Sequence, residues 1–266
     1  MNIGIIGCAG RMGRILTATV LETDGAELAG GTEQANSQFI GEDVATLAGC
    51  EPCGTAVGEN PLELFEVSGA VVDFTAPAGT VGHARLAAES GTALVIGTTG
   101  LDAADMDAIK IASKKTTIVQ ASNMSLGVNL LLGLVETVAR SLGEEYDIEI
   151  VEMHHRHKAD APSGTALMLG EAAARGRGVE LNAVSERVRD GRTGARVAGK
   201  IGFANLRGGD VVGEHTVIMA GPGERVELTH RAADRRIFAR GAIRAALWTQ
   251  GKVPGFYNMR DVLGVD

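Results

Sequence analysis

The chain has 266 residues, of which 45% are hydrophobic and 22% are charged, and its formal net charge is −8. This length allows one large domain or two smaller ones, and the composition is that of an ordinary globular protein. The acidic balance argues against general binding to nucleic acids or membrane surfaces. No apolar run reaches the length of about 18 residues that a membrane helix needs, so we expect no membrane segment.

The three cysteines, Cys8, Cys50 and Cys53, are an odd number. The N-terminus enters a predicted strand without a preceding basic segment. Both features favour reduced thiols, no signal peptide and a cytoplasmic protein. Cys50 and Cys53 form a C-x-x-C pattern, but no second pair accompanies it. We therefore interpret this pattern as a loop rather than as a zinc or redox site.

In chain order, the first elements predict a dinucleotide-binding fold. An apolar strand at residues 2–6 runs into the turn GCAGRMG at residues 7–13, a helical pattern follows, and a strand at residues 26–31 leads to Glu33. Glycines in such a turn allow a tight bend, close approach of a pyrophosphate, and close packing of helix on strand. Glu33 follows Gly13 by 20 residues, the spacing expected for the acid that binds the ribose hydroxyls. We therefore favour a cofactor site over a purely structural turn.

The residues after Glu33 bear on which cofactor is used. They read QANSQ at residues 34–38 and include neither lysine nor arginine. A 2′-phosphate requires a cation at this place. We expect NADH to be used at least as well as NADPH.

Three further strands predict the rest of a doubly wound parallel sheet. They are expected at residues 70–74, 93–96 and 116–120, with helices at 83–89 and 102–113. The carboxyl ends of parallel strands lie at one edge of the sheet, where ligands bind. The candidate cofactor contacts at this edge are Gly97, Thr98, Thr99, Ala121, Ser122, Asn123 and Met124. Taken singly, each of these turns is equally compatible with a plain connection between strand and helix.

The second half of the chain predicts a different architecture. A long apolar helix at residues 126–142 precedes a strand at 146–153, and three strands then follow one another without helices, at 201–206, 211–219 and 225–229. Consecutive strands favour an α+β domain with a mixed sheet, one face of which would suit oligomer formation. The Gly- and Arg-rich residues 176–199 between them are interpreted as a solvated loop, with a cationic lid over an anionic substrate as the alternative.

These elements divide the chain into two domains. Residues 1–125 form the dinucleotide-binding domain, and residues 126–233 form the substrate-binding and oligomerisation domain. The C-terminal segment, residues 234–266, carries a helix at 234–248 that packs back on the first domain. Residues 255–257 are expected to begin a tail.

Residues 152–166, which read EMHHRHKADAPSGTA, are the candidate catalytic loop. His154 and Lys158 can supply protons, because histidine titrates near neutral pH and lysine is tuned by its surroundings. Ser163 or Thr165 can cap the helix that follows, and the N-terminus of that helix suits a substrate carboxylate. Two alternatives remain open. One is a solvated polar loop, and the other is a metal site at His155 and His157, which no nearby cysteine or carboxylate supports.

The order and spacing of five motifs resemble the 4-hydroxy-tetrahydrodipicolinate reductase family, also called dihydrodipicolinate reductase. The motifs are GCAGRMG at 7–13, DFTAP at 73–77, GTTG at 97–100, NMS at 123–125 and the loop at 152–166. The resemblance covers nearly the whole chain. It implies an α/β protein with an N-terminal Rossmann-type doubly wound parallel sheet and a C-terminal α+β mixed-sheet domain for substrate binding and tetramerisation. It also implies a cytoplasmic homotetramer that reduces a small dicarboxylate with NADH or NADPH in the diaminopimelate route to lysine, without a metal.

The resemblance also assigns roles to individual residues. It makes His154 the proton donor and acceptor, Lys158 a second proton donor, and His155, Gly164 and Thr165 substrate contacts. The cofactor contacts that it implies are Gly7, Cys8, Ala9, Gly10, Arg11, Met12, Glu33, residues 97–99 and residues 121–124. Gln34 departs from the family pattern, because many members have an arginine there, and this departure argues against a preference for NADPH.

Two other functional classes fit a two-domain dinucleotide-binding protein. One is a different oxidoreductase of similar plan, such as a semialdehyde or amino-acid dehydrogenase. A semialdehyde dehydrogenase needs a cysteine nucleophile near the nicotinamide, whereas Cys8 lies in the phosphate turn. A non-catalytic nucleotide sensor would not need His154, Lys158 and a second anion site together. Both classes are therefore less favoured than the reductase.

Overall fold

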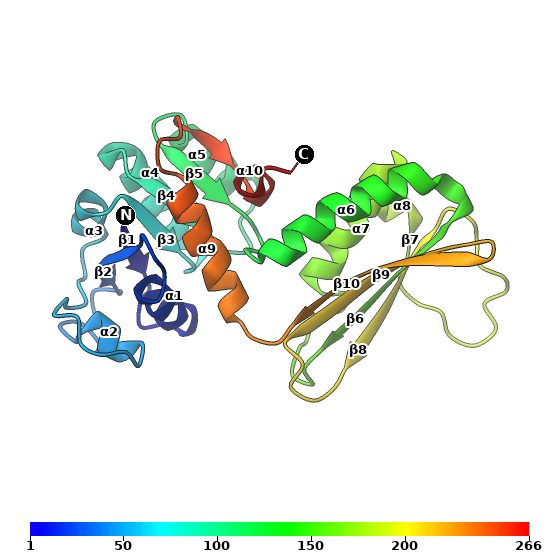
Figure 1. Ribbon diagram of the computed structural model, residues 1–266, viewed down its shortest axis with the longest axis horizontal. Helices are drawn as coiled ribbons and strands as arrows, with labels where there is room; N and C mark the ends of the chain where they lie inside the picture. The colour runs from blue at the N-terminus through cyan, green and yellow to red at the C-terminus, as the bar shows by residue number, and fades with distance from the viewer. Residues whose placement is uncertain (266) are drawn as a thin grey trace. The chain divides into compact units, whose positions relative to one another are not determined.

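The computed structural model describes residues 1–265, which divide into two compact units (Figure 1). Unit 1 comprises Met1–Leu126 and Arg236–Gly264, and unit 2 comprises Gly127–Arg235 together with Val265. Each unit is built on a sheet of its own. The predicted fold class is confirmed, because the first sheet is parallel with helices on both faces and the second is mixed.

The sheet of unit 1 has six parallel strands in the order β11-β5-β4-β3-β1-β2. Their bounds are β1 Asn2–Ile6, β2 Glu27–Thr32, β3 Ala70–Asp73, β4 Ala93–Ile96, β5 Thr117–Gln120 and β11 Gly255–Tyr257. The strand order reverses at β1, which pairs with β2 on one side and with β3 on the other. Ligands of open α/β sheets bind outside the carboxyl ends of the strands at such a reversal.

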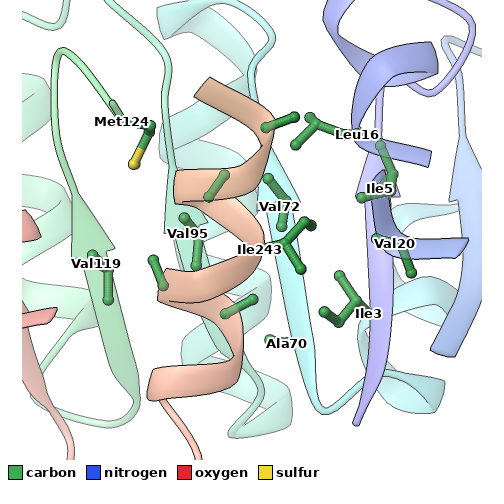
Figure 2. Packing of buried hydrophobic residues seen from close by; sticks show 14 of the residues in the cluster. Ile3, Ile5, Leu16, Val20, Ala70, Val72, Val95, Val119, Met124 and Ile243 are labelled. Atoms are coloured by element: carbon green, nitrogen blue, oxygen red, sulfur yellow. The ribbon is translucent and has the colours of Figure 1, made fainter. Parts of the chain in front are cut away.

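Helices cover both faces of this sheet, because successive strand residues point to opposite faces and both sets are apolar. The helices α1, α9 and α10 contribute to the core on one face, and α3, α4 and α5 to the core on the other. Figure 2 shows Ile243 of α9 close to Val72 and Val95. The helices of unit 1 are α1 Arg11–Leu21, α2 Val44–Leu47, α3 Pro61–Val67, α4 Pro77–Ser90, α5 Ala103–Ala112, α9 Arg236–Trp248 and α10 Met259–Leu263.

Two elements of unit 1 differ from the prediction. Helix α4 begins at Pro77 rather than at residue 83, because proline suits the first turn of a helix, where its missing N–H is not needed. Residues 255–257, expected to begin a tail, form the short strand β11, which pairs with β5 at the edge of the sheet.

Unit 2 contains a five-stranded mixed sheet in the order β10-β9-β6-β8-β7, with β6 parallel to β8 and antiparallel to β9. Residues of α6, α7 and α8 pack with alternate residues of β6, β8 and β9 to form its core. The strands are β6 Asp147–His154, β7 Ser185–Glu186, β8 Ile201–Arg207, β9 Gly213–Gly221 and β10 Glu224–Ala232. The helices are α6 Leu126–Leu142, η1 Gly143–Glu145, α7 Gly164–Arg177 and α8 Leu181–Val184.

The segment Leu126–Glu145, which comprises α6 and η1, bears on the expectation that the chain has no membrane helix. By length and composition alone it is long and apolar enough to cross a membrane. Its apolar side chains have a place in the fold, since five of them are buried in the core of unit 2: Val128, Leu131, Leu132, Val135 and Ala139.

The Gly- and Arg-rich segment that follows α8 is held to the sheet of unit 2 by ion pairs. Arg189 contacts Glu149 and Glu186, with N–O distances of 2.7 and 2.5 Å. Arg196 contacts Glu149 and Asp147, at 2.9 and 2.6 Å. These partners account for both arginines without an anionic substrate.

Candidate functional site

The turn after β1 lies against the start of α1. Gly7 has a φ of +70°, in the left-handed region that favours glycine, and its N–H donates to the Thr32 carbonyl oxygen at 2.8 Å. A Cβ atom at Gly13 would overlap the carbonyl oxygen of Gly7 and the backbone of Cys8, so only glycine permits this approach. The backbone of the turn is therefore drawn close to the helix N-terminus, as a pyrophosphate cradle requires.

The structure brings Glu33 to this turn. Its Oε1 accepts a hydrogen bond from the N–H of Ala9 at 2.9 Å. Glu33 also lines a cavity of about 300 Å³ at the reversal of strand order, whose other lining residues include Gly7, Thr32, Thr75, Gly79 and His83. This cavity, the glycine cradle and the acid beside it fit a dinucleotide cofactor.

Cys8 occupies the place of the usual first glycine and is 1% exposed. Burial, followed by the nearby charge of Glu33, raises the pKa of its thiol to about 12. A thiol of this kind stays neutral and is a poor nucleophile. The environment of Cys8 therefore argues against the semialdehyde dehydrogenase alternative.

The other candidate cofactor residues lie at the start of α1 and at the carboxyl ends of β4 and β5. Gly10 is the N-cap of α1, and Arg11 and Met12 are its first two residues. Thr98 is buried and donates to Asp73 at 3.4 Å, so its side chain faces the protein interior. Of the remaining residues, Gly10, Thr99 and Ser122 are exposed, Gly97 and Asn123 are partly buried, and Ala121 and Met124 are buried.

Sequence reasoning missed one polar cluster at this edge. Asp73, the last residue of β3, is fully buried and accepts hydrogen bonds from the N–H and Oγ1 of Thr75 at 2.8 and 2.6 Å. Its second oxygen lies 2.8 Å from Nδ1 of His83. Burial would raise the pKa of Asp73, but the interactions with His83 and Thr75 outweigh it and lower the pKa. Asp73 thus anchors the turn that follows β3.

In unit 2, side chains that alternate along β6 place His154, the candidate proton donor, on the buried face of the strand. The buried residues of β6 are Ile148, Ile150, Glu152 and His154, so two polar side chains continue the core face of the strand. Residues directly opposite each other in a sheet share a face. Glu152 lies opposite His215 of β9, and His154 lies opposite Arg207 of β8. The sheet therefore gathers these four side chains at one end of the core.

Glu152 is the centre of this group and is 1% exposed. Its Oε2 forms a short contact with Nδ1 of His154, and its Oε1 accepts from Arg207 at 2.8 Å and from the N–H of Ser163 at 3.3 Å. Burial would raise the pKa of Glu152, but Arg207 and His154 lower it below the ordinary value. Burial lowers the pKa of His154, against the opposing effect of Glu152.

His215 packs edge-on against His154, with ring centroids 5.1 Å apart and an interplanar angle of 74°. Its Nε2 lies 3.0 Å from Oγ of Ser163. Burial and the neighbouring His154 lower the pKa of His215 to about 4, so it is neutral near pH 7. His215 connects the histidine of β6 to the start of α7.

The loop between β6 and α7 carries the other candidates. Nζ of Lys158 lies 2.8 Å from Oδ1 of Asp160. Ser163, rather than Thr165, is the N-cap of α7, and its Oγ accepts from the N–H of Ala166 at 3.2 Å. Gly164 is exposed and Thr165 is partly buried at the first turn of this helix. The strand end, the ammonium group and the helix N-terminus are thus parts of one polar site in unit 2.

Several side chains of this site are of the types that bind metals, and their contacts are hydrogen bonds. The rings of His155 and His157 are 6.3 Å apart and tilted by 39°. Among the described residues, the atoms of metal-ligand type that lie within 4.8 Å of one another belong to Glu152, His154 and His215. Both oxygens of Glu152 already accept hydrogen bonds, and the cation beside them is Arg207. Hydrogen bonds therefore explain this cluster.

Sequence reasoning missed Glu152, Arg207 and His215 as members of the site. A signal for Glu152 was present, because it lies two residues before His154 and side chains alternate along a strand. Arg207 and His215 depend on the pairing register of β8 and β9, which the sequence alone does not specify.

Comparisons with known proteins agree over the whole chain. Residues 1–124 match the family model described as dihydrodipicolinate reductase, N-terminus, and residues 127–263 match the one described as dihydrodipicolinate reductase, C-terminus. A protein of Ruegeria pomeroyi named 4-hydroxy-tetrahydrodipicolinate reductase is 56% identical, covering 99% of this chain and 98% of that protein. A protein of the same name from Brucella abortus is 55% identical and covers 100% of both chains.

Solved structures show a similar fold. Dipicolinate-bound dihydrodipicolinate reductase from Paenisporosarcina sp. TG-14 has a TM-score of 0.78 at 22% identity, covering 97% of each chain. A probable dehydrogenase from Thermotoga maritima has a TM-score of 0.63 at 15% identity, covering 98% of this chain and 92% of the other. At these identities the likeness concerns the fold alone.

Proposed function

The chain belongs to the dihydrodipicolinate reductase family, and from this premise we propose how it works. It reduces 4-hydroxy-tetrahydrodipicolinate, by way of dihydrodipicolinate, to tetrahydrodipicolinate in the diaminopimelate route to lysine. The observation that carries the proposal is the polar site of unit 2, where a buried histidine–glutamate pair lies at the end of β6 in the loop motif of this family.

The cofactor, when bound, supplies a hydride. Gly7 to Met12 would hold its pyrophosphate, because the turn and the N-terminus of α1 present backbone N–H groups. Glu33 would accept hydrogen bonds from the ribose hydroxyls. Residues 97–99 and 121–124, at the ends of β4 and β5, would contact the nicotinamide half. The absence of lysine and arginine from residues 34–38 supports efficient use of NADH.

The substrate carries two carboxylates, which explains why one loop carries several donors. Gly164 and Thr165 would bind one carboxylate at the N-terminus of α7, and His155 and Lys158 would contact the other side of the ring. The reductase from Paenisporosarcina is bound to dipicolinate, a planar dicarboxylate, which supports this class of substrate.

His154 would supply the proton. Reduction of the conjugated double bond leaves negative charge on a ring carbon, and Nε2 of His154 would protonate it. The Lys158 ammonium would stabilise the developing charge and would provide a second donor. The proposed cofactor residues are in unit 1 and the proposed proton donors are in unit 2. We therefore propose that the units close during turnover, with hinges near residues 124–130 and near Ala233. We also propose that the protein is a cytoplasmic homotetramer, which assembles through the sheets of unit 2.

The decisive experiment follows NADH oxidation in the presence of the product of the preceding aldolase step. We expect turnover by the wild-type protein and a loss of about 10²–10⁴ in kcat for His154→Gln, because this variant lacks the acid. Titration with NADH, followed by its fluorescence, should give the same Kd for both proteins. Near-normal turnover of the variant would remove His154 from this role.

A further inference from the structure

We propose that Glu152 is a positioning residue for the proton donor, because its carboxylate binds Nδ1 of His154 and leaves Nε2 as the nitrogen that delivers the proton. In the same proposal, Arg207 keeps this carboxylate ionised and in place. The inference rests on the proposed function, since it concerns the acid of that reaction.

The contacts of Glu152 specify the tautomer of His154. An ionised carboxylate only accepts hydrogen bonds, so Nδ1 must carry a proton where it meets Oε2. The other ring nitrogen points toward Gly213, where an added Cβ atom would lie 3.0 Å from Nε2. Glycine at this position leaves room beside Nε2, the nitrogen that would meet a substrate.

The burial of Glu152 indicates a specific role. A carboxylate that is 1% exposed has lost its hydration, and it stays ionised only where a cation and hydrogen bonds replace the lost water. Arg207 does so at 2.8 Å, and the same guanidinium donates to the carbonyl oxygen of Asp160 at 2.6 Å. Asp160 in turn pairs with Lys158. One arginine therefore connects the histidine–glutamate pair to the loop that carries the second donor.

The charges around His154 give Glu152 a second effect. The titratable or charged groups that act on His154 come from every neighbouring element: Glu152 of β6, Arg207 of β8, His215 of β9 and Lys158 of the loop. Glu152 is the anion in this set. Without it, an imidazolium at residue 154 would face Arg207 and Lys158, and the remaining acid nearby, Asp160, is already paired with Lys158.

The proton transfer uses only His154 and Glu152 of this site. The imidazolium of His154 carries protons on both nitrogens, and its Nε2–H bond breaks as a C–H bond forms at the ring carbon. The histidine is then neutral with its remaining proton on Nδ1, and Glu152 stays ionised throughout. A proton from the solution reloads Nε2 before the next turnover, so each reduction consumes one proton from the solution. The hydride of the same reaction comes from the nicotinamide cofactor of the proposed function.

Two substitutions of opposite effect test this role. Glu152→Gln keeps the shape but removes the anion, so the pH at which kcat/KM declines on the alkaline side should move down. We expect kcat to fall at least about tenfold, with little change in substrate KM. Arg207→Gln removes a nearby cation, so the same decline should move to higher pH. A merely structural role would not shift the two profiles in opposite directions.

A second readout does not depend on turnover. The ¹⁵N signals of His154 should report a fixed Nδ1–H tautomer in the wild-type protein, and a mixture of tautomers with a lower titration midpoint in Glu152→Gln. Glu152→Asp keeps the charge and should keep the wild-type midpoint, which maintains the test if the glutamine variant folds poorly. The matched control is Glu214→Gln. Glu214 lies on the adjacent strand β9, and its carboxylate pairs with Arg231 rather than with a residue of the site.

Unchanged pH profiles and unchanged His154 signals in both Glu152→Gln and Arg207→Gln would overturn the inference. Those results would leave the proposed function standing, provided that the wild-type protein oxidises NADH with the substrate. Absence of wild-type turnover would instead refute the proposed function. The ¹⁵N measurement would still decide whether Glu152 orients His154.

Discussion

At the scale of single residues, Gln34 is the side chain beside the acid that would bind the cofactor ribose. It lines the same cavity as Glu33 and is one of five residues in a row without a positive charge. An arginine can pair with a 2′-phosphate through two hydrogen bonds, whereas glutamine offers no charge. The identity of this residue therefore bears directly on the choice between the two nicotinamide cofactors.

We expect the wild-type kcat/KM for NADH to equal or exceed that for NADPH, and Gln34→Arg to raise the NADPH to NADH ratio by about tenfold or more. Steady-state assays with both cofactors measure this ratio. Gln250→Arg, the same substitution in the turn after α9, is the matched control and should leave the ratio unchanged. A large NADPH preference in the wild-type protein would contradict the prediction.

Sequence reasoning was most effective for residues whose role depends on local spacing. The distance from Gly13 to Glu33 predicts that the acid returns to the turn, and the hydrogen bond from Ala9 to Glu33 confirms that they meet. Cys8 could not be explained in this way. Its side chain lies against Gly31 of β2, where an added Cβ atom would be 2.7 Å from Sγ, so a glycine on a different strand makes room for it.

At the scale of elements, α7 shows how a helix end becomes part of a site. Ser163 caps the helix, which leaves Gly164 and Thr165 at its first turn. The first N–H groups of a helix lack intrahelical partners and carry partial positive charge. These features support the assignment of Thr165 to a substrate carboxylate.

Thr165→Val removes one hydroxyl and preserves the shape of the side chain. We expect it to raise the substrate KM by about 10- to 100-fold, because a hydrogen bond to a charged group contributes about 1.5–3 kcal/mol. Steady-state kinetics with varied substrate measure this effect, and the Kd for NADH is the internal control. An unchanged KM would place the carboxylate at another group.

Element boundaries were less predictable than element types. The strand predicted at residues 211–219 runs from Gly213 to Gly221, because its pairing with β10 extends to that turn. β11 has only three residues and no period that the sequence reveals, and it forms because β5 offers an unpaired edge. Pairing with another strand decided both cases, with a neighbour in sequence for β9 and with a distant strand for β11.

At the scale of the whole molecule, buried ionisable groups make stability depend on pH. The pKa of His215 is lowered from its ordinary value of about 6.5 to about 4 in the folded protein. Between these two pH values, the unfolded chain binds a proton at this histidine and the folded protein does not. Asp73 and Glu152 also have lowered pKa values, so each stabilises the fold while it is ionised. This stabilisation is lost at lower pH, where the two carboxylates become protonated. Acid therefore weakens the fold first through the histidines whose pKa values are lowered, His215 among them.

We expect the free energy of unfolding to fall as the pH is lowered from 6.5 to 4, and to fall less in His215→Gln. The difference should approach about 3 kcal/mol, because each unit of pKa shift corresponds to about 1.4 kcal/mol. Urea denaturation at pH 7 and at pH 4 measures it. Equal losses in the two proteins would show that His215 takes up a proton in the folded state without cost.

Unit 1 is completed by a segment that follows unit 2 in the chain, and this has a consequence for biosynthesis. Helix α9 supplies Ala239, Ala242 and Ile243 to one apolar layer, and β11 closes the free edge of β5 (Figure 1). A ribosome that has released only the first 235 residues has therefore produced a sheet with one face partly bare and one edge unpaired. The nascent chain must be shielded from association with its neighbours until α9 and β11 have emerged.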